Sequence, residues 1–412
     1  MPTVEFKDVD IIFGKTPSAA LPYLARGASR DEILEATGNV LGVADASLAV
    51  EEGEICVLMG LSGSGKSTLL RAVNGLNKVT RGQVLVEDDG AAVDVASCDA
   101  NTLRRLRAYR VAMVFQQFAL LPWRTVHENV GLGLELRGMP KAERDAVVDE
   151  KLKLVGLDRW KDKYGHELSG GMQQRVGLAR AFATDADILL MDEPFSALDP
   201  LIRDHLQDEL LELQHRLKKT IIFVSHDLDE ALKIGTHIAI MEGGRIVQFG
   251  EPEQIVLSPA SQYVADFVAH MNPLNVLRGA SLMTPVDEIA RANGALRLDW
   301  SGHTMLTLDG DGRPETVTVE GVAARLMACG PDIDAKQLGS DICAMVAPSV
   351  RLRTALEFRH ATGKPVVLVE DGRMVGVIGD EEIYRGILRQ TSLAERDFDT
   401  AASDLPELPE EP

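Results

Sequence analysis

One loop of the sequence has the composition and spacing of a phosphate-binding site. It follows the strand-like run of residues 54–59, precedes the helical pattern of residues 69–73, and matches GxxxxGK[ST]. Backbone N–H groups of such a loop can surround phosphate oxygens, and the start of the following helix adds positive partial charge. We expect Lys66 to reach the β- and γ-phosphates and the Ser67 hydroxyl to bind Mg²⁺. The predicted nucleotide-binding residues of the loop are Gly60, Ser62, Gly63, Ser64, Gly65, Lys66, Ser67 and Thr68.

Two consecutive carboxylates follow a second apolar run, at residues 188–191. Because side chains alternate across a strand, Asp192 and Glu193 would point in different directions. We expect Asp192 to join Ser67 around the Mg²⁺ ion. Glu193 is the candidate general base, which would polarise the water that attacks the γ-phosphate in line. Without the glycine-rich loop, a helix cap would be an equally good interpretation of the pair.

A third motif reads Leu-Ser-Gly-Gly-Met-Gln-Gln-Arg, at residues 168–175, and precedes a helical pattern. Its serine hydroxyl and glycine amides at a helix N-terminus could form a second phosphate site. The motif resembles the LSGGQ-type signature of ABC-transporter ATPases. The resemblance implies ATP as the nucleotide and a head-to-tail homodimer, in which the signature of one chain contacts the ATP held by its twin. It assigns this contact to Ser169, Gly170, Gly171, Gln173 and, in the loop at residues 196–199, Asp199.

Further positions take roles from the same resemblance. Gln116 is similar to the glutamine that approaches Mg²⁺ and the attacking water, although Gln117 is adjacent. His226 follows the apolar run of residues 220–224 and is similar to the switch histidine that contacts the γ-phosphate. Phe13 is a candidate to stack on adenine, with a place in the core as an equal alternative. The expected catalytic set is Glu193, His226 and Gln116, and the expected Mg²⁺ set is Ser67, Gln116 and Asp192.

The elements that must position these residues alternate between apolar strands and helical patterns, which predicts a largely parallel α/β sheet. The resemblance implies a P-loop NTPase of the ABC-cassette type, with a mixed sheet core, an antiparallel β subdomain and a helical signature subdomain. We expect this ATPase domain to span residues 1–275. Residues 15–42 are typical of an insertion between two early strands, with a short helix that is capped at Ser29 and ends at Gly38.

The rest of the chain divides into a region at residues 276–394 and a tail at 395–412. Residues 365–378 predict two apolar strands joined by an Asp-Gly turn, and a helix should follow to residue 390. This pattern resembles the second half of a CBS module, a small α/β sensor unit, so we expect a CBS-like regulatory domain. The expected first half of the module, at residues 281–345, departs from the CBS pattern. A degenerate module with only a structural role therefore remains an alternative. The acidic, proline-rich tail has too little apolar surface to fold.

Composition restricts the class of function. The 412 residues carry 43 Lys+Arg against 63 Asp+Glu, a formal charge of −20, which argues against nucleic acid as the main partner because a basic face is normally required. No uninterrupted apolar stretch reaches about 18 residues, and the start has neither part of an export signal. We therefore expect neither a membrane span nor export. The cysteines Cys56, Cys98, Cys329 and Cys343 lack zinc-ligand spacing and are interpreted as reduced core thiols.

A narrower resemblance concerns the transported molecule. The insertion and the segments at residues 114–122 and 195–203 are similar to those of ATPase subunits of glycine betaine/proline and choline importers, and residues 268–277 are closer to the choline-type branch. This implies ATP-driven import of choline, glycine betaine or proline through separate integral-membrane permease subunits, with a substrate-binding protein acting indirectly. The chain would be peripheral, at the cytoplasmic face of the inner (cell) membrane. Trp123, which follows Gln116, would help to receive the permease.

Two other classes of function remain open from the sequence. A soluble ABC ATPase acting on nucleic acid or ribosomes would usually carry two cassettes or a long coiled-coil insertion, and the sequence contains neither. A non-hydrolysing nucleotide sensor could combine the glycine-rich loop with the C-terminal region. Glu193 and His226 both argue against the sensor.

Overall fold

The structure is a computed structural model that describes residues 1–269, 272–292, 294–330 and 333–388. The described residues form two compact units, which divide the chain into Met1–Met271 (unit 1) and Asn272–Pro412 (unit 2). The boundary expected after residue 275 falls just beyond this division. The tail expected at residues 395–412 and the end of the last expected helix, residues 389–390, lie outside the described residues.

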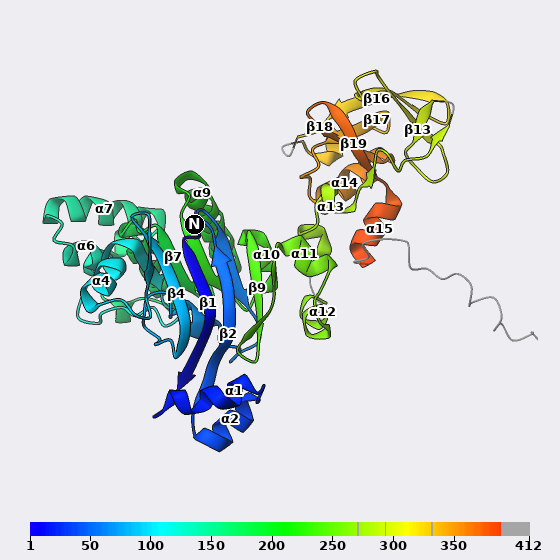
Figure 1. Ribbon diagram of the computed structural model, residues 1–412. Coiled ribbons are helices and arrows are strands. Elements are labelled where there is room, and N and C mark those ends of the chain that lie inside the picture. Colours follow the sequence, from blue (N-terminus) through cyan, green and yellow to red (C-terminus); the bar gives the residue numbers. More distant parts are fainter. Residues whose placement is uncertain (270–271, 293, 331–332, 389–412) are drawn as a thin grey trace, which may run out of the picture. The chain divides into compact units, whose positions relative to one another are not determined.

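A mostly parallel sheet forms the centre of unit 1 (Figure 1). In sheet order its strands are β10 (Arg245–Gly250), β9 (His237–Glu242), β3 (Ile55–Met59), β8 (Thr220–Val224), β7 (Ile188–Asp192) and β6 (Val111–Val114). The central strands β3, β7 and β8 are buried along their whole length, as expected for parallel strands covered on both faces. Within the described residues of this sheet, only the edge strand β10 pairs antiparallel. The predicted α/β sheet is therefore confirmed.

A second sheet in unit 1 is antiparallel. Its order is β2 (Val40–Val50), β1 (Val4–Phe13), β4 (Arg81–Asp88) and β5 (Ala91–Asp94). Buried side chains from both sheets join one hydrophobic cluster, which includes Val4 and Val84 from this sheet and Leu58 and Leu190 from the parallel one. The core of unit 1 thus extends across both sheets and fixes the antiparallel subdomain to the strands that carry the motifs.

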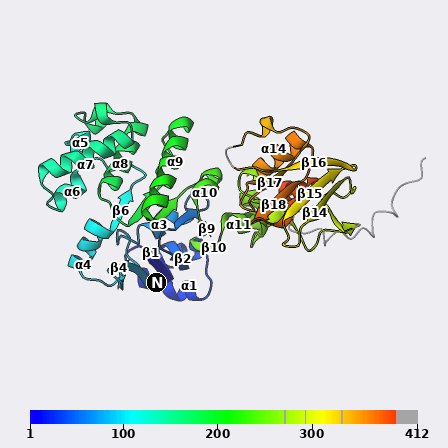
Figure 2. The same cartoon turned by 90° about the horizontal axis from the view of Figure 1, so that it is seen from above.

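Outside the insertion between β1 and β2, the helices of unit 1 form two groups. One accompanies the parallel sheet: α3 (Lys66–Leu70), α4 (Ala100–Arg105), η2 (Leu106–Arg110), α9 (Pro200–Leu217), α10 (Leu228–Ile234), α11 (Pro252–Leu257) and α12 (Gln262–Val268). The other is a helical lobe, visible in Figure 2, that corresponds to the predicted signature subdomain: α5 (Val126–Val130), α6 (Leu132–Leu136), α7 (Lys141–Leu154), η3 (Asp158–Trp160), η4 (Gly165–Glu167) and α8 (Gly170–Ala183). Across the described part of the chain, every helix falls short of the length and apolar character needed to cross a bilayer.

The predicted insertion lies between β1 and β2 and contains η1 (Pro17–Ala20), α1 (Leu21–Ala25) and α2 (Arg30–Thr37). Helix α2 begins with a capping box, in which the Ser29 hydroxyl and the Glu32 carboxylate accept from each other's backbone N–H groups. It ends at Gly38, whose φ of +66° is the left-handed conformation that glycine adopts without a Cβ clash. Both helix ends are as predicted. Figure 1 shows α1 and α2 beyond the ends of β1 and β2.

Unit 2 is built on a third sheet. In order it contains β11 (Thr284–Pro285), β19 (Arg373–Ile378), β18 (Val366–Glu370), β17 (Ile342–Val346), β16 (Val322–Ala328), β15 (Pro314–Val319), β14 (Thr304–Leu308), β13 (Ala295–Arg297) and β12 (Arg291–Ala292). Its helices are η5 (Pro273–Asn275), α13 (Gly279–Leu282), η6 (Ala335–Gln337), α14 (Leu352–Thr362) and α15 (Asp380–Leu388). The C-terminal part of unit 2 has α/β character, because its elements follow one another in the order β17, α14, β18, β19, α15.

The predicted hairpin of unit 2 is confirmed, because β18 and β19 pair antiparallel and Asp371 and Gly372 both have positive φ in the turn. The expected first CBS half, at residues 281–345, is described except for residues 293, 331 and 332. From β12 to β16 the described residues form a meander of short antiparallel strands, which explains why the sequence pattern departs there.

The four cysteines are free. Cys56, Cys329 and Cys343 are buried, as predicted for core thiols. Burial raises the pKa of the Cys343 thiol to about 12 and also raises the pKa of the Cys56 thiol. Cys98 is only partly buried, so its assignment to the core was wrong: it follows the edge strand β5 rather than lying in a central strand.

Candidate active site

The glycine-rich loop connects β3 to α3, as its motif predicts. Two of its glycines are required by close packing. A Cβ on Gly60 would lie 2.1 Å from the Met241 carbonyl oxygen, and one on Gly65 would lie 2.5 Å from the Gly42 carbonyl oxygen. Both also have positive φ, so a larger residue would meet both a clash and backbone strain. The loop therefore sits directly against β2 and β9.

Lys66 is bonded to the backbone of its own loop. Its Nζ donates to the carbonyl oxygens of Gly60 (2.8 Å) and Leu61 (3.0 Å). Burial lowers the pKa of Lys66, while the nearby carboxylates of Glu193 and Asp192 raise it by a smaller amount. The ammonium thus lies between backbone carbonyls that an incoming phosphate can replace, in a place where added negative charge would favour its charged form.

Asp192 ends β7 and is fully buried. Its Oδ1 accepts from the Ser67 hydroxyl at 2.6 Å, as the predicted pairing of these two residues requires. Its Oδ2 accepts from Arg71 Nη2 at 2.8 Å. Arg71 was not predicted from the sequence. The available signal was its position four residues after Ser67, which places both on one face of the helical turn.

We expect Arg71→Met to lower the free energy of unfolding of unit 1 by about 1–3 kcal/mol, because it leaves a buried carboxylate without its cation. The effect should be below that of a fully buried pair, since the arginine side chain is 37% exposed. Urea denaturation of the purified chain measures it. Arg104→Met is the matched control, because Arg104 is exposed and the one hydrogen bond of its guanidinium among the described residues is to the Asn101 side chain, at 3.4 Å. Equal stability of the two variants would contradict the expectation.

Glu193 follows Asp192 and lies between two of the predicted catalytic side chains. Its Oε2 accepts from Gln116 Nε2 at 3.2 Å and lies 3.3 Å from His226 Nδ1. Its backbone adopts φ +49°, which is uncommon for a residue other than glycine, and its N–H donates to the Val224 carbonyl oxygen. The structure therefore favours Gln116, rather than Gln117, as the glutamine of the site.

Gln174 is a second residue whose role the sequence analysis missed. It belongs to the signature motif, is almost fully buried, and lies on α8. Its Nε2 donates to the Glu193 carbonyl oxygen at 3.1 Å, and its Oε1 accepts from the Ala197 N–H at 3.1 Å. The signature helix is thereby tied to the backbone of the candidate base and to the loop before Asp199. The two adjacent glutamines of the motif, at residues 173–174, were the sequence feature that could have identified Gln174.

A cavity of about 570 Å³ opens over the glycine-rich loop. Phe13, 42% exposed, lies in its wall rather than in the core. Arg30, from the insertion, is a lining residue that the sequence analysis did not identify. The predicted residues that line the cavity are Phe13, Ser62, Gly63, Gly65, Lys66, Ser67, Thr68, Gln116, Glu193 and His226. Gly60, Ser64 and Asp192 are buried and are not among the lining residues.

The signature residues do not line that cavity. Ser169 caps α8, where its hydroxyl accepts from the Met172 N–H, and Asp199 caps α9 in the same way through the Ile202 N–H. Gly171 lies against the Ala197 carbonyl oxygen, which would be 3.2 Å from a Cβ at that position. With Gly170 and Gln173, these residues form a separate group at helix N-termini, away from the phosphate loop of their own chain.

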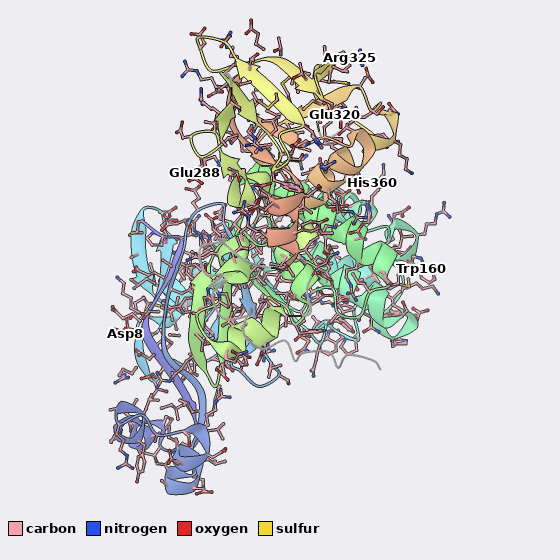
Figure 3. All side chains as sticks on the ribbon, turned by 90° about the vertical axis from the view of Figure 1, so that its right-hand side faces the viewer. Asp8, Trp160, Glu288, Glu320, Arg325 and His360 are labelled. Atoms are coloured by element: carbon pink, nitrogen blue, oxygen red, sulfur yellow. The ribbon has the colours of Figure 1, made fainter. Side chains whose placement is uncertain are left out.

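Unit 2 contains its own cavity of about 430 Å³, next to the N-terminus of α15. Glu288 and Glu320, labelled in Figure 3, are among its lining residues. Glu382 is buried at one side, where its carboxylate accepts from the Thr284 hydroxyl, the Gly379 N–H and Arg385. This glutamate therefore stabilises the fold of the predicted CBS-like half.

Comparisons with known proteins agree on the family to which this chain is similar. A family model described as ABC transporter matches residues 43–196. Over 264 residues the chain is 53% identical to the glycine betaine/proline betaine transport system ATP-binding protein ProV of Escherichia coli (strain K12). That alignment covers 64% of this chain and 65% of ProV, which is less than two thirds of the relative. The glycine betaine transport ATP-binding protein OpuAA of Bacillus subtilis (strain 168) is 41% identical over 95% of this chain and 91% of OpuAA.

A solved structure shares the fold of unit 1. It is the dimeric structure of a post-hydrolysis state of the ATP-binding cassette MJ0796 bound to ADP and Pi. The match has a TM-score of 0.52 and 30% sequence identity, and it covers 60% of this chain and 98% of that chain. The predicted cassette fold is thereby confirmed.

Proposed function

This chain belongs to the ABC-transporter family of ATP-binding proteins that includes the glycine betaine transport subunits, and we propose that it hydrolyses ATP to power import of a quaternary amine. The position of Glu193 carries this proposal. Its carboxylate lies at the phosphate-loop cavity and contacts both Gln116 and His226. A carboxylate held in this way can accept a proton from a water molecule placed for attack on the γ-phosphate.

In this proposal, different groups of the chain bind the phosphates, orient the Glu193 carboxylate and contact the adenine. The glycine-rich loop offers N–H groups, and Lys66 offers its ammonium, to the phosphates. Gln116 and His226 orient the Glu193 carboxylate and place hydrogen-bonding groups at the cavity wall. Phe13 offers an aromatic face for adenine. This arrangement favours hydrolysis over a role as a non-hydrolysing sensor.

A Mg²⁺ ion fits the donors near Ser67. Ser67, Gln116 and Asp192 supply hydroxyl, amide and carboxylate oxygens, which are the hard ligands this ion prefers. Among the described residues, no group of three His, Cys, Asp or Glu side chains could hold a metal ion, so phosphate and water would complete the coordination. When bound, the ion would neutralise part of the charge of the phosphates.

We further propose that two copies assemble head to tail. Ser169, Gly170, Gly171, Gln173 and Asp199 gather at helix N-termini outside their own phosphate-loop cavity. A helix N-terminus with free amides is suited to a phosphate. In the dimer, this group would contact the γ-phosphate of ATP held by the other copy, which would give it the function it lacks in a single chain.

The proposed partners are integral-membrane permease subunits and, indirectly, a substrate-binding protein, which would place the chain peripherally at the cytoplasmic face of the cell membrane. ProV and OpuAA are described as glycine betaine transport proteins, so glycine betaine is the first substrate to test, with choline and proline as the others. The choline-type branch stays a prediction, and part of its segment, residues 270–271, lies outside the described residues. A soluble ABC ATPase acting on nucleic acid or ribosomes is the alternative.

We expect Trp123→Ser to abolish co-purification with the permease and betaine uptake while ATP hydrolysis by the isolated chain persists. Trp123 is 71% exposed, and a large exposed aromatic residue is typical of the centre of an interface. Its position after Gln116 would connect the permease to the nucleotide site. Uptake of labelled glycine betaine in cells that contain the chain and its permease measures the effect.

Trp160→Ser is the matched control. Trp160, labelled in Figure 3, is 41% exposed and ends η3 elsewhere in the helical lobe. Its loss should leave uptake unchanged. If Trp123→Ser transported normally, Trp123 would not be part of the permease surface. If the wild-type chain co-purified with ribosomes and without a permease, the transport proposal would be replaced by the alternative.

A further inference from the structure

One arginine of the insertion enters the nucleotide cavity. Arg30 is the first residue of α2 and lines the cavity together with Gly63 and Lys66. Its Nη1 donates to the Gly63 carbonyl oxygen at 2.6 Å, and its Nη2 donates to the Gly42 carbonyl oxygen at 2.8 Å. A single guanidinium thus connects the insertion, the glycine-rich loop and β2.

The turn between β9 and β10 reaches the same place. A Cβ on Gly244 would lie 3.1 Å from Arg30 Nη2, so only glycine leaves the guanidinium its full space. Gly244 also donates its N–H to the Ser64 carbonyl oxygen and accepts from the Ala44 N–H. Arg30 Nε is buried and has no hydrogen-bond partner within the described residues, and burial lowers the pKa of the side chain. Two hydrogen bonds and partial burial thus restrain this arginine more than a solvated surface side chain.

Lys66 and Arg30 hold different carbonyl oxygens of the loop. Lys66 bonds those of Gly60 and Leu61, whereas Arg30 bonds that of Gly63. A triphosphate attracts the lysine ammonium to its own oxygens, which would release the two carbonyls that Lys66 holds here. The Gly63 carbonyl has no part in that exchange. Arg30 can therefore keep its contact when nucleotide binds.

We propose that Arg30 is a positioning residue that holds the glycine-rich loop in its phosphate-binding shape, so that the insertion contributes to nucleotide affinity. The inference rests on the proposed function, because it concerns the same ATP site. Arg30 donates to backbone carbonyls, and no hydrogen bond or ion pair in the described part of the chain links it to Glu193 or His226. Its loss should therefore weaken the ground state and the transition state equally, which raises KM and leaves kcat unchanged.

The test uses the purified full chain and Mg·ATP. Arg30→Met keeps the length of the side chain and removes both charge-assisted hydrogen bonds, so KM for ATP should rise roughly 10-fold while kcat stays within about twofold. Arg30→Lys should recover only part of the affinity, because an ammonium lacks the planar fork that reaches two carbonyls. Arg26→Met is the matched control within the insertion: the Arg26 guanidinium stacks on the Tyr23 ring, 4.1 Å from its centroid, and KM should not change.

Equilibrium binding gives an independent readout. The dissociation constants of ATP and ADP should rise by the same factor in Arg30→Met, because both nucleotides carry a β-phosphate. Thermal unfolding without nucleotide establishes that each variant is folded, and Arg30→Lys provides the test if Arg30→Met is not. A normal KM in a folded Arg30 variant, a fall in kcat alone, or an equal rise of KM in Arg26→Met would each overturn the inference. Absence of ATP hydrolysis by the wild-type chain would instead overturn the proposed function.

Discussion

Glu193→Gln should reduce steady-state ATP hydrolysis by roughly 10²–10⁴-fold, the contribution typical of a positioned general base. The amide keeps the size of the side chain and can still accept from Gln116 Nε2, which contacts Glu193 at 3.2 Å, but it cannot take a proton from water. ATP binding should be unchanged. Phosphate release by the purified chain and equilibrium binding of ATP measure the two effects.

The same variant tests the head-to-tail dimer. With ATP bound and not hydrolysed, Glu193→Gln should elute from a size-exclusion column as a dimer in Mg·ATP. Adding Ser169→Asp should return it to a monomer, because aspartate still caps α8 while its charge repels the partner's γ-phosphate.

Glu242→Gln is the control for turnover, since Glu242 is an exposed glutamate at the end of β9. Normal turnover in Glu193→Gln would show that another group is the base.

Lys66→Ala should weaken ATP binding by roughly 100-fold or more and abolish turnover at ordinary ATP concentrations. It removes the buried ammonium that we expect to bind the phosphates, and charge-assisted hydrogen bonds are stronger than neutral ones. The carbonyl oxygens of Gly60 and Leu61 also lose their donor. Binding is measured by isothermal titration calorimetry with the non-hydrolysable analogue of ATP.

Lys78→Ala is the control for this substitution. Lys78 is exposed and does not line the nucleotide cavity, so its removal changes the net charge by the same amount without touching the site. ATP affinity should match that of the wild type. Equal affinities in Lys66→Ala and Lys78→Ala would mean that the loop does not bind phosphate in the way its motif indicates.

The motif residues were predictable because each motif carries its own local geometry. The GxxxxGK[ST] pattern predicts a tight loop before a helix, and the structure places Gly60 and Gly65 where no Cβ fits. The paired carboxylates after an apolar strand predict that Asp192 and Glu193 divide between two roles. In the structure Asp192 bonds Ser67, and Glu193 lies beside Gln116 and His226.

In unit 2, local sequence patterns predicted one part of the structure and not another. The turn at Asp371 and Gly372 was predictable because both residues readily adopt positive φ. The meander from β12 to β16 was not, since strands of two to seven residues carry too few alternations to give a reliable periodicity. The structure places this meander where the sequence resemblance to a CBS module is weakest.

Residue order along the chain was enough to predict the phosphate loop, the paired carboxylates and the capped helix of the insertion, because neighbouring residues specify those conformations. The signature was assigned from its resemblance to a known family. Folding decided which distant groups meet. Arg71 and Asp192 are 121 positions apart and Arg30 and Gly63 are 33 apart, yet each pair is bonded. Such contacts depend on strand order and on the course of an insertion, which hydrophobic periodicity does not encode. The second nucleotide contact that we propose for Ser169 likewise depends on another copy of the chain, because Ser169 does not line the phosphate-loop cavity of its own chain.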